Sequence, residues 1–157
     1  MFRCLAKKKP RSPIDLVLDS LDERSVKALG VIALVLAGQL RLCRSCPNYK
    51  AELRSKFVRG YLFGFIDASL QRLDLPCSSE EEAILRIIAG HSFVFLDQKI
   101  DAIQYVKDSV DLQDDPTYKA AHQQGVEELY AYLEPDGKSN PIGLLSYFHP
   151  LDLSEDI

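Results

Sequence analysis

The amino-acid sequence predicts an all-α fold, a compact bundle of five or six helices around a buried central helical hairpin. Three observations predict it: apolar residues recur at helical spacing, several segments open with helix-capping residues, and no convincing strand pattern occurs. With 157 residues, 46% hydrophobic and 27% charged, the chain is long enough for one domain with a sizeable core. We expect a flexible basic arm over 1–12, a single helical domain over 13–150 and an acidic tail over 151–157.

The first two helices are predicted by a capping pattern and by a long apolar run. Ser12 followed by Pro13 is typical of a helix start, because Ser caps the free amides and Pro suits the first helical position. The second helix is expected over 25–42, where 13 successive residues carry no charge. A membrane-spanning helix needs about 20 apolar residues, so we expect this helix to be buried in a soluble protein.

The third helix, expected over 48–73, is apolar on most of its circumference and should therefore be surrounded by protein. Gly60, Gly64 and Ala68 recur at four-residue spacing along it. Small residues at this spacing allow two helix backbones to approach closely. We expect the helix to pack antiparallel to 25–42, with the glycine stripe at their crossing, so that the two form the central hairpin.

Three further helices follow. Ser79 and Glu82 match a capping box, which predicts a helix that runs from 79 toward 110 with a bend near Gly90. Asp115 and the proline after it start a fifth helix that reaches 133, and a short helix is expected over the segment IGLLSYF.

Charge is divided unevenly along the chain. Residues 1–59 carry 13 Lys and Arg against 5 Asp and Glu, and residues 60–157 carry 6 against 18. The two halves either neutralise each other within the fold or indicate an acidic partner. Neither a nucleic-acid-binding motif nor a secretory signal is present, since Asp15, Asp19 and Asp22 interrupt the first apolar stretch. We expect a cytoplasmic protein.

A cluster of positive charge surrounds the turn that follows the second helix. Arg41, Arg44, Lys50 and Arg54 lie close together there, at the expected start of the third helix. This surface could bind an anion or an acidic partner protein. The alternative is a solvated basic surface that faces the acidic half of the same molecule.

Cys43 and Cys46 form a C-x-x-C pattern in the same turn. Such a pair can bind a metal or act in redox chemistry, but a structural zinc site needs a second ligand pair and a redox motif normally lies in a strand-rich unit. The alternative is that the thiols are free and incidental.

A second candidate site is a buried polar cluster. Asp67 lies in the most apolar helix, and His91 and His122 lie in apolar arcs of the following helices. A buried carboxylate must be paired or protonated, so these side chains could bind a small ligand or a metal, or could simply satisfy one another inside the core.

The sequence contains none of the motifs G-x-S-x-G, G-x-x-x-x-G-K or H-E-x-x-H. We therefore expect no cofactor and favour a small non-catalytic protein that acts by macromolecular interaction, as an adaptor, immunity or regulatory protein does. Its partner would be another protein, with an acidic surface, and a homodimer stays open. The alternative is a helical ligand- or metal-binding protein, or an unfamiliar enzyme, that uses the Asp/His cluster.

Overall fold

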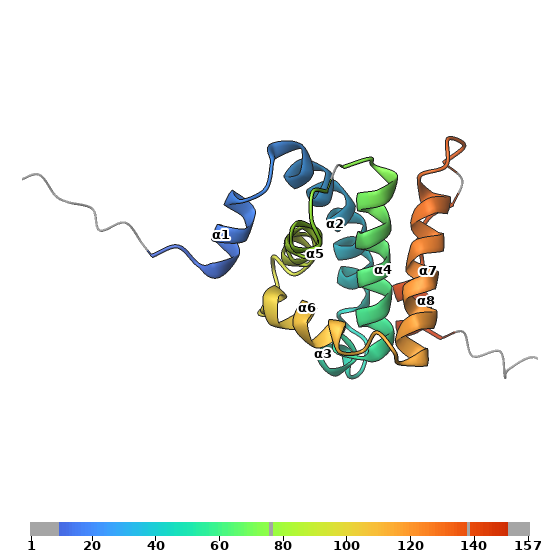
Figure 1. Ribbon diagram of the computed structural model, residues 1–157. Coiled ribbons are helices and arrows are strands. Elements are labelled where there is room, and N and C mark those ends of the chain that lie inside the picture. Colours follow the sequence, from blue (N-terminus) through green and yellow to red (C-terminus); the bar gives the residue numbers. More distant parts are fainter. Residues whose placement is uncertain (1–9, 76, 138, 151–157) are drawn as a thin grey trace, which may run out of the picture.

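The computed structural model describes residues 10–75, 77–137 and 139–150 (Figure 1). These residues form eight helices, six of them with at least seven residues, and contain no strands, so the all-α prediction is confirmed. The helices are α1 (Pro13–Asp19), α2 (Glu23–Cys43), α3 (Tyr49–Glu52), α4 (Lys56–Arg72), α5 (Glu80–Val94), α6 (Ala102–Val110), α7 (Pro116–Tyr132) and α8 (Gly143–Phe148). Most of the basic arm and all of the acidic tail lie outside the described residues.

We expected one helix over 48–73, but this segment forms two helices, α3 and α4. Ser55 begins the second, α4, because its hydroxyl accepts a hydrogen bond from the backbone amide of Val58 at 3.2 Å. A serine that caps free amides favours a helix start even inside an apolar segment. The short α3 is therefore a helix separate from α4.

The segment 79–110 is also divided, and the division is not at Gly90. This glycine lies inside α5, where a Cβ would come within 2.8 Å of the Ile66 side chain. The helix instead ends at Val94, and Asp101 caps α6 by accepting hydrogen bonds from the amides of Ile103 and Gln104 at 3.0 and 3.1 Å. Segment 95–101 is thereby left as a non-helical connection.

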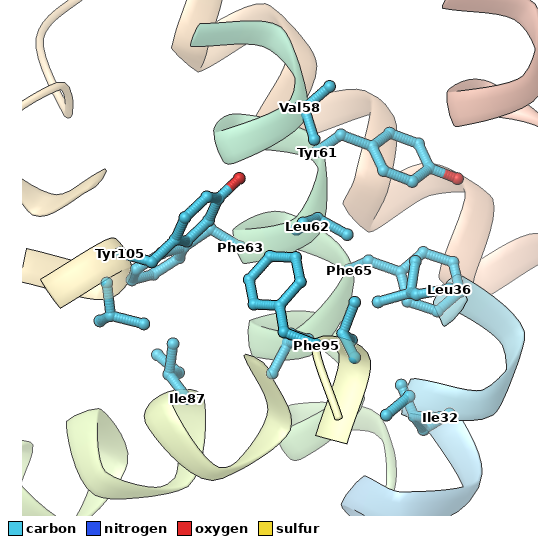
Figure 2. Close-up of a cluster of buried hydrophobic side chains, with 14 of the residues drawn as sticks. Ile32, Leu36, Val58, Tyr61, Leu62, Phe63, Phe65, Ile87, Phe95 and Tyr105 are labelled. Carbon is cyan, nitrogen blue, oxygen red and sulfur yellow. The ribbon is translucent and has the colours of Figure 1, made fainter. Parts of the chain in front are cut away.

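Helix α4 is the central helix, as its apolar circumference predicts. Twelve of its seventeen residues are buried, and α2, α5, α6, α7 and α8 all pack against it (Figure 1). Figure 2 shows how side chains from several helices meet around it, among them Leu36 from α2, Phe65 from α4 and Tyr105 from α6. The rings of Phe95 and Tyr105 pack edge to face, with centroids 4.8 Å apart. The core is thus built on α4 rather than on two equal central helices.

The prediction that the glycine stripe packs against the helix over 25–42 is wrong. Helix α4 packs most closely on α7, not on α2, and the two helices lie side by side in Figure 1. A Cβ at Gly60 would lie 2.4 Å from the carbonyl oxygen of Tyr118, and a Cβ at Gly64 would lie 2.1 Å from that of His122. Because these contacts advance in the same direction along both helices, α4 and α7 are parallel. Gly125 supplies the matching small residue on α7, where a Cβ would lie 2.3 Å from the Tyr61 carbonyl oxygen.

Helix α2 has one buried and one exposed face. Leu36 and Leu40 are fully buried, whereas Val31, Leu34 and Leu42 are 63%, 72% and 65% exposed. Among the described helices, α2 alone is long and apolar enough to cross a membrane, with a mean hydropathy of 1.7 over 18 residues, of which 39% are buried. A core helix of a soluble protein passes the same test. The complete helix is longer than the 13-residue uncharged run on which the sequence argument against a membrane span was based.

Candidate functional site

A surface pocket of about 550 Å³ lies between α3, the turn before it and the segment that connects α5 to α6. Four cationic side chains line it: Arg44, Lys50, Arg54 and Lys99. Among the lining residues described, Asp97 is the one carboxylate. The pocket is therefore strongly positive, and it contains three of the four residues of the basic surface predicted from the sequence.

The remaining wall of this basic pocket is largely apolar. Leu53 and Ile100 contribute aliphatic surface, and Tyr49 and Gln98 also line the pocket. The Tyr49 hydroxyl donates a hydrogen bond to Oε1 of Gln98 at 3.2 Å, which joins α3 to the 95–101 segment. A pocket with apolar walls and a few charged groups is typical of sites that orient a ligand through its polar end.

Asp97 neutralises the edge of the pocket that is nearest to α2. Its Oδ2 lies 2.5 Å from Nη2 of Arg44 and 3.8 Å from Nη2 of Arg41. The hydrogen bond from Arg44 holds the pKa of Asp97 below its usual value. Arg41, the fourth predicted residue, is therefore beside the pocket rather than in its lining.

The other three cations have no such partner. No ion pair within the described part of the chain involves Lys50, Arg54 or Lys99. Their charges are thus available to a ligand, whereas the charge of Arg44 is already compensated by Asp97. The acidic half of the molecule thus pairs with Arg44 and Arg41 at the edge of this surface, and not with the other three cations among the described residues.

Local backbone features position the short helix α3 that carries Lys50. Asn48 caps it in the left-handed conformation, with φ at 59°, which asparagine tolerates better than most residues. Tyr49 is buried, and the Tyr105 hydroxyl of α6 donates to the carbonyl oxygen of Leu53 at 2.7 Å. The helix is therefore held at both ends although it has only four residues.

Sequence reasoning missed Lys99 and the role of Asp97. Both lie in the segment 79–110 that was expected to be helical. The end of α5 at Val94 instead turns this segment toward α3. The polar run Asp97–Gln98–Lys99 after an apolar helix was the local signal for such a break.

The structure brings together part of the predicted Asp/His cluster. Asp67 and His122 interact electrostatically: burial raises the pKa of Asp67, and the His122 charge and a hydrogen bond from Gln71 oppose that shift. His91 lies elsewhere. It neighbours the ring of Phe63 at a centroid distance of 6.0 Å, as His122 does at 6.2 Å, but among the described residues the two imidazoles make no ring contact with each other.

A smaller cavity of about 340 Å³ adjoins this region. His122, Phe63 and Tyr118 are among its lining residues, and neither Asp67 nor His91 is. The Tyr118 hydroxyl is buried and has no hydrogen-bond partner among the described residues. The cavity thus contains one residue of the predicted cluster, His122.

The two cysteines of the C-x-x-C pattern have different surroundings. Cys43 is fully buried, and burial raises the pKa of its thiol to about 11. Cys46 is partly exposed and lies against His149, a contact that the sequence did not indicate. In the part of the chain that the structure describes, no three His, Cys, Asp or Glu side chains are grouped so that they could hold a metal ion.

Comparison with known proteins adds no family to this description. No protein-family model, no curated protein and no solved structure matches the chain. We therefore infer a function from the geometry and charge of the basic pocket.

Proposed function

We propose that this is a small non-catalytic protein that acts by macromolecular interaction, in an adaptor, immunity or regulatory role. In this proposal the basic pocket binds an acidic segment of a partner protein. The observation that supports it is the group of three cations, Lys50, Arg54 and Lys99, that border one pocket and form no ion pair with described residues. Cytoplasmic location is part of the same proposal.

The chemistry of the pocket suits carboxylates on a peptide. A guanidinium such as that of Arg54 can donate two parallel hydrogen bonds to one carboxylate, and the lysines add mobile point charges. Leu53 and Ile100 offer apolar surface to a neighbouring side chain of the same segment. The helical bundle built around α4 serves as the scaffold that keeps these groups in place.

A labelled acidic peptide tests this function. We expect a fluorescein-labelled peptide of six glutamates and two leucines to bind the wild type, and to bind at least about tenfold more weakly to Lys50→Glu/Lys99→Glu, because two ion pairs each worth up to about 1 kcal/mol become repulsive. Fluorescence anisotropy measures both affinities. Binding should also weaken as salt rises.

The matched control is Lys27→Glu/Lys107→Glu, which makes the same change in net charge at two exposed lysines outside the pocket. It should retain the wild-type affinity within about twofold. Equal weakening of the two double variants would show that only net charge matters and would contradict the proposed pocket, as would failure of the wild type to bind.

A second candidate function is the binding of a small ligand in the 340 Å³ cavity. The buried Tyr118 hydroxyl, which lacks a hydrogen-bond partner among the described residues, favours it, since such groups are normally paired. A small molecule that co-purifies with the wild type and is lost from His122→Ala would favour this function over the first.

A further inference from the structure

A cysteine and a histidine that are far apart in the sequence lie in contact beside the basic pocket. The Sγ atom of Cys46 is 3.2 Å from Nε2 and 3.7 Å from Nδ1 of His149. The thiol is partly exposed and the imidazole is exposed. The pair is therefore within hydrogen-bond distance and accessible from solvent.

Each of the two residues lies just after a helix of the packed bundle. The backbone amide of Cys46 donates to the carbonyl oxygen of Cys43 at 2.9 Å, in the turn that ends α2. His149 follows α8, which packs on α2, and the preceding ring of Phe148 lies 5.4 Å from that of Tyr49. The packing of α8 thus places the His149 backbone near the turn that carries Cys46.

The other two described thiols lack this combination of access and a base. Cys43 is fully buried, and its pKa is raised to about 11. Cys77 is exposed, but its Sγ donates to the carbonyl oxygen of Ser79 at 3.0 Å, and no contact between it and an imidazole is seen among the described residues. A thiolate, not a thiol, is the nucleophile, so a neighbouring proton acceptor decides which cysteine reacts first.

We propose that Cys46, with His149 as its base, is the most reactive of the three described thiols and a site of covalent modification by soft electrophiles. The imidazole takes the thiol proton. The sulfur lone pair then forms a bond to an electrophilic carbon, as in iodoacetamide, and iodide leaves with the electron pair of the carbon–iodine bond. This site goes beyond the proposed function, which involves the charges of the pocket and no thiol.

Competitive alkylation tests the proposal. The full chain with Cys4→Ser, which removes the cysteine outside the described residues, is treated with iodoacetamide at pH 7, and mass spectrometry follows each thiol with time. We expect Cys46 to react about tenfold faster than Cys77, although Cys77 is the more exposed, because an unassisted thiol is only a few per cent thiolate at this pH.

His149→Gln tests whether the imidazole acts as a base or only packs against the thiol. Glutamine keeps a polar side chain but cannot accept the thiol proton. Its Cys46 should react about tenfold more slowly, whereas the rate at Cys77 should stay unchanged. Lys107→Gln, at an exposed residue outside both pockets, is the control and should leave both rates unchanged. The proposal is overturned if Cys77 reacts as fast as Cys46 in the wild type, or if His149→Gln leaves the rate at Cys46 unaltered.

Discussion

His91 lies fully buried in α5, with its Nδ1 at 2.9 Å from the carbonyl oxygen of Ile87. A carbonyl oxygen only accepts, so Nδ1 carries a proton in this hydrogen bond. Its Nε2 has no hydrogen-bond partner among the described residues. Burial lowers the pKa of His91 to about 4. The hydrogen bond to Ile87 raises this pKa in part, and the charge of Arg59 lowers it slightly further.

This pKa makes stability depend on pH in a defined window. The unfolded chain binds a proton at this residue below about pH 6.5, but the folded chain only below about pH 4. The free energy of unfolding should therefore decrease by on the order of 3 kcal/mol as the pH is lowered from about 6.5 to about 4. His91→Phe removes the titrating group. Urea denaturation at pH 7, 5.5 and 4.5 should show the wild type losing more stability than this variant, and parallel curves would refute the assignment.

At the scale of helices, the contact between α4 and α7 depends on glycine. Gly64→Ala should destabilise the protein by about 1–3 kcal/mol, because its Cβ would lie 2.1 Å from a backbone oxygen of His122 and the whole of α7 would have to move. Chemical denaturation at 25 °C measures this loss.

Gly38→Ala is the control for Gly64→Ala. Gly38 is exposed inside α2, and a Cβ there would meet nothing within 4 Å. Alanine is the better helix former by about 1 kcal/mol, so this variant should be slightly more stable than the wild type. If Gly64→Ala also gained stability, the two helix backbones could not be as close as the structure places them.

At the scale of the whole molecule, Glu128 of α7 connects three helices. Its Oε2 accepts hydrogen bonds from the Tyr61 hydroxyl of α4 at 2.7 Å and from the amides of Ile142 and Gly143, where α8 begins, at 2.9 Å each. A carboxylate at a helix start satisfies amides that would otherwise lack partners. Glu128 therefore fastens α8 to the rest of the bundle.

Glu128→Ala should release α8 while leaving the central helix folded. We expect hydrogen exchange of the α8 amides to accelerate at least about tenfold, since one charged acceptor is worth about 1.5–3 kcal/mol, with α4 little changed. The neighbouring Glu127→Ala should have no such effect, because among the described residues the Glu127 side chain accepts from Gln123 alone, on its own helix, at 2.9 Å. Unchanged exchange in α8 would contradict this role for Glu128.

The uneven charge along the chain is resolved only in part inside the fold. Ion pairs such as Lys56–Asp115 at 2.6 Å and Arg44–Asp97 at 2.5 Å join the basic and acidic halves, as one of the two sequence interpretations requires. Lys50 and Arg54, however, are left without an ion pair in the described chain. Neutralisation within the fold therefore applies to part of the basic half, and an acidic partner for the rest stays a proposal.

Helix content and most helix starts could be predicted from the sequence, because capping and apolar periodicity act between residues a few positions apart. Ser12, Ser79 and Asp115 cap helices where the sequence indicates it, and the burial of α4 follows from its apolar circumference. Three of the four predicted basic residues could be placed in one pocket because they, too, are close in the sequence, within eleven residues of one another.

Partners distant in the sequence were decided by the tertiary structure. The stripe of Gly60 and Gly64 indicates that some backbone comes close, but only the packed bundle selects α7 over α2, because Gly125 supplies the complementary gap. Lys99 enters the pocket because the chain turns after α5, and Cys46 meets a histidine 103 residues away. Such contacts depend on how whole helices pack, which local side-chain patterns do not specify.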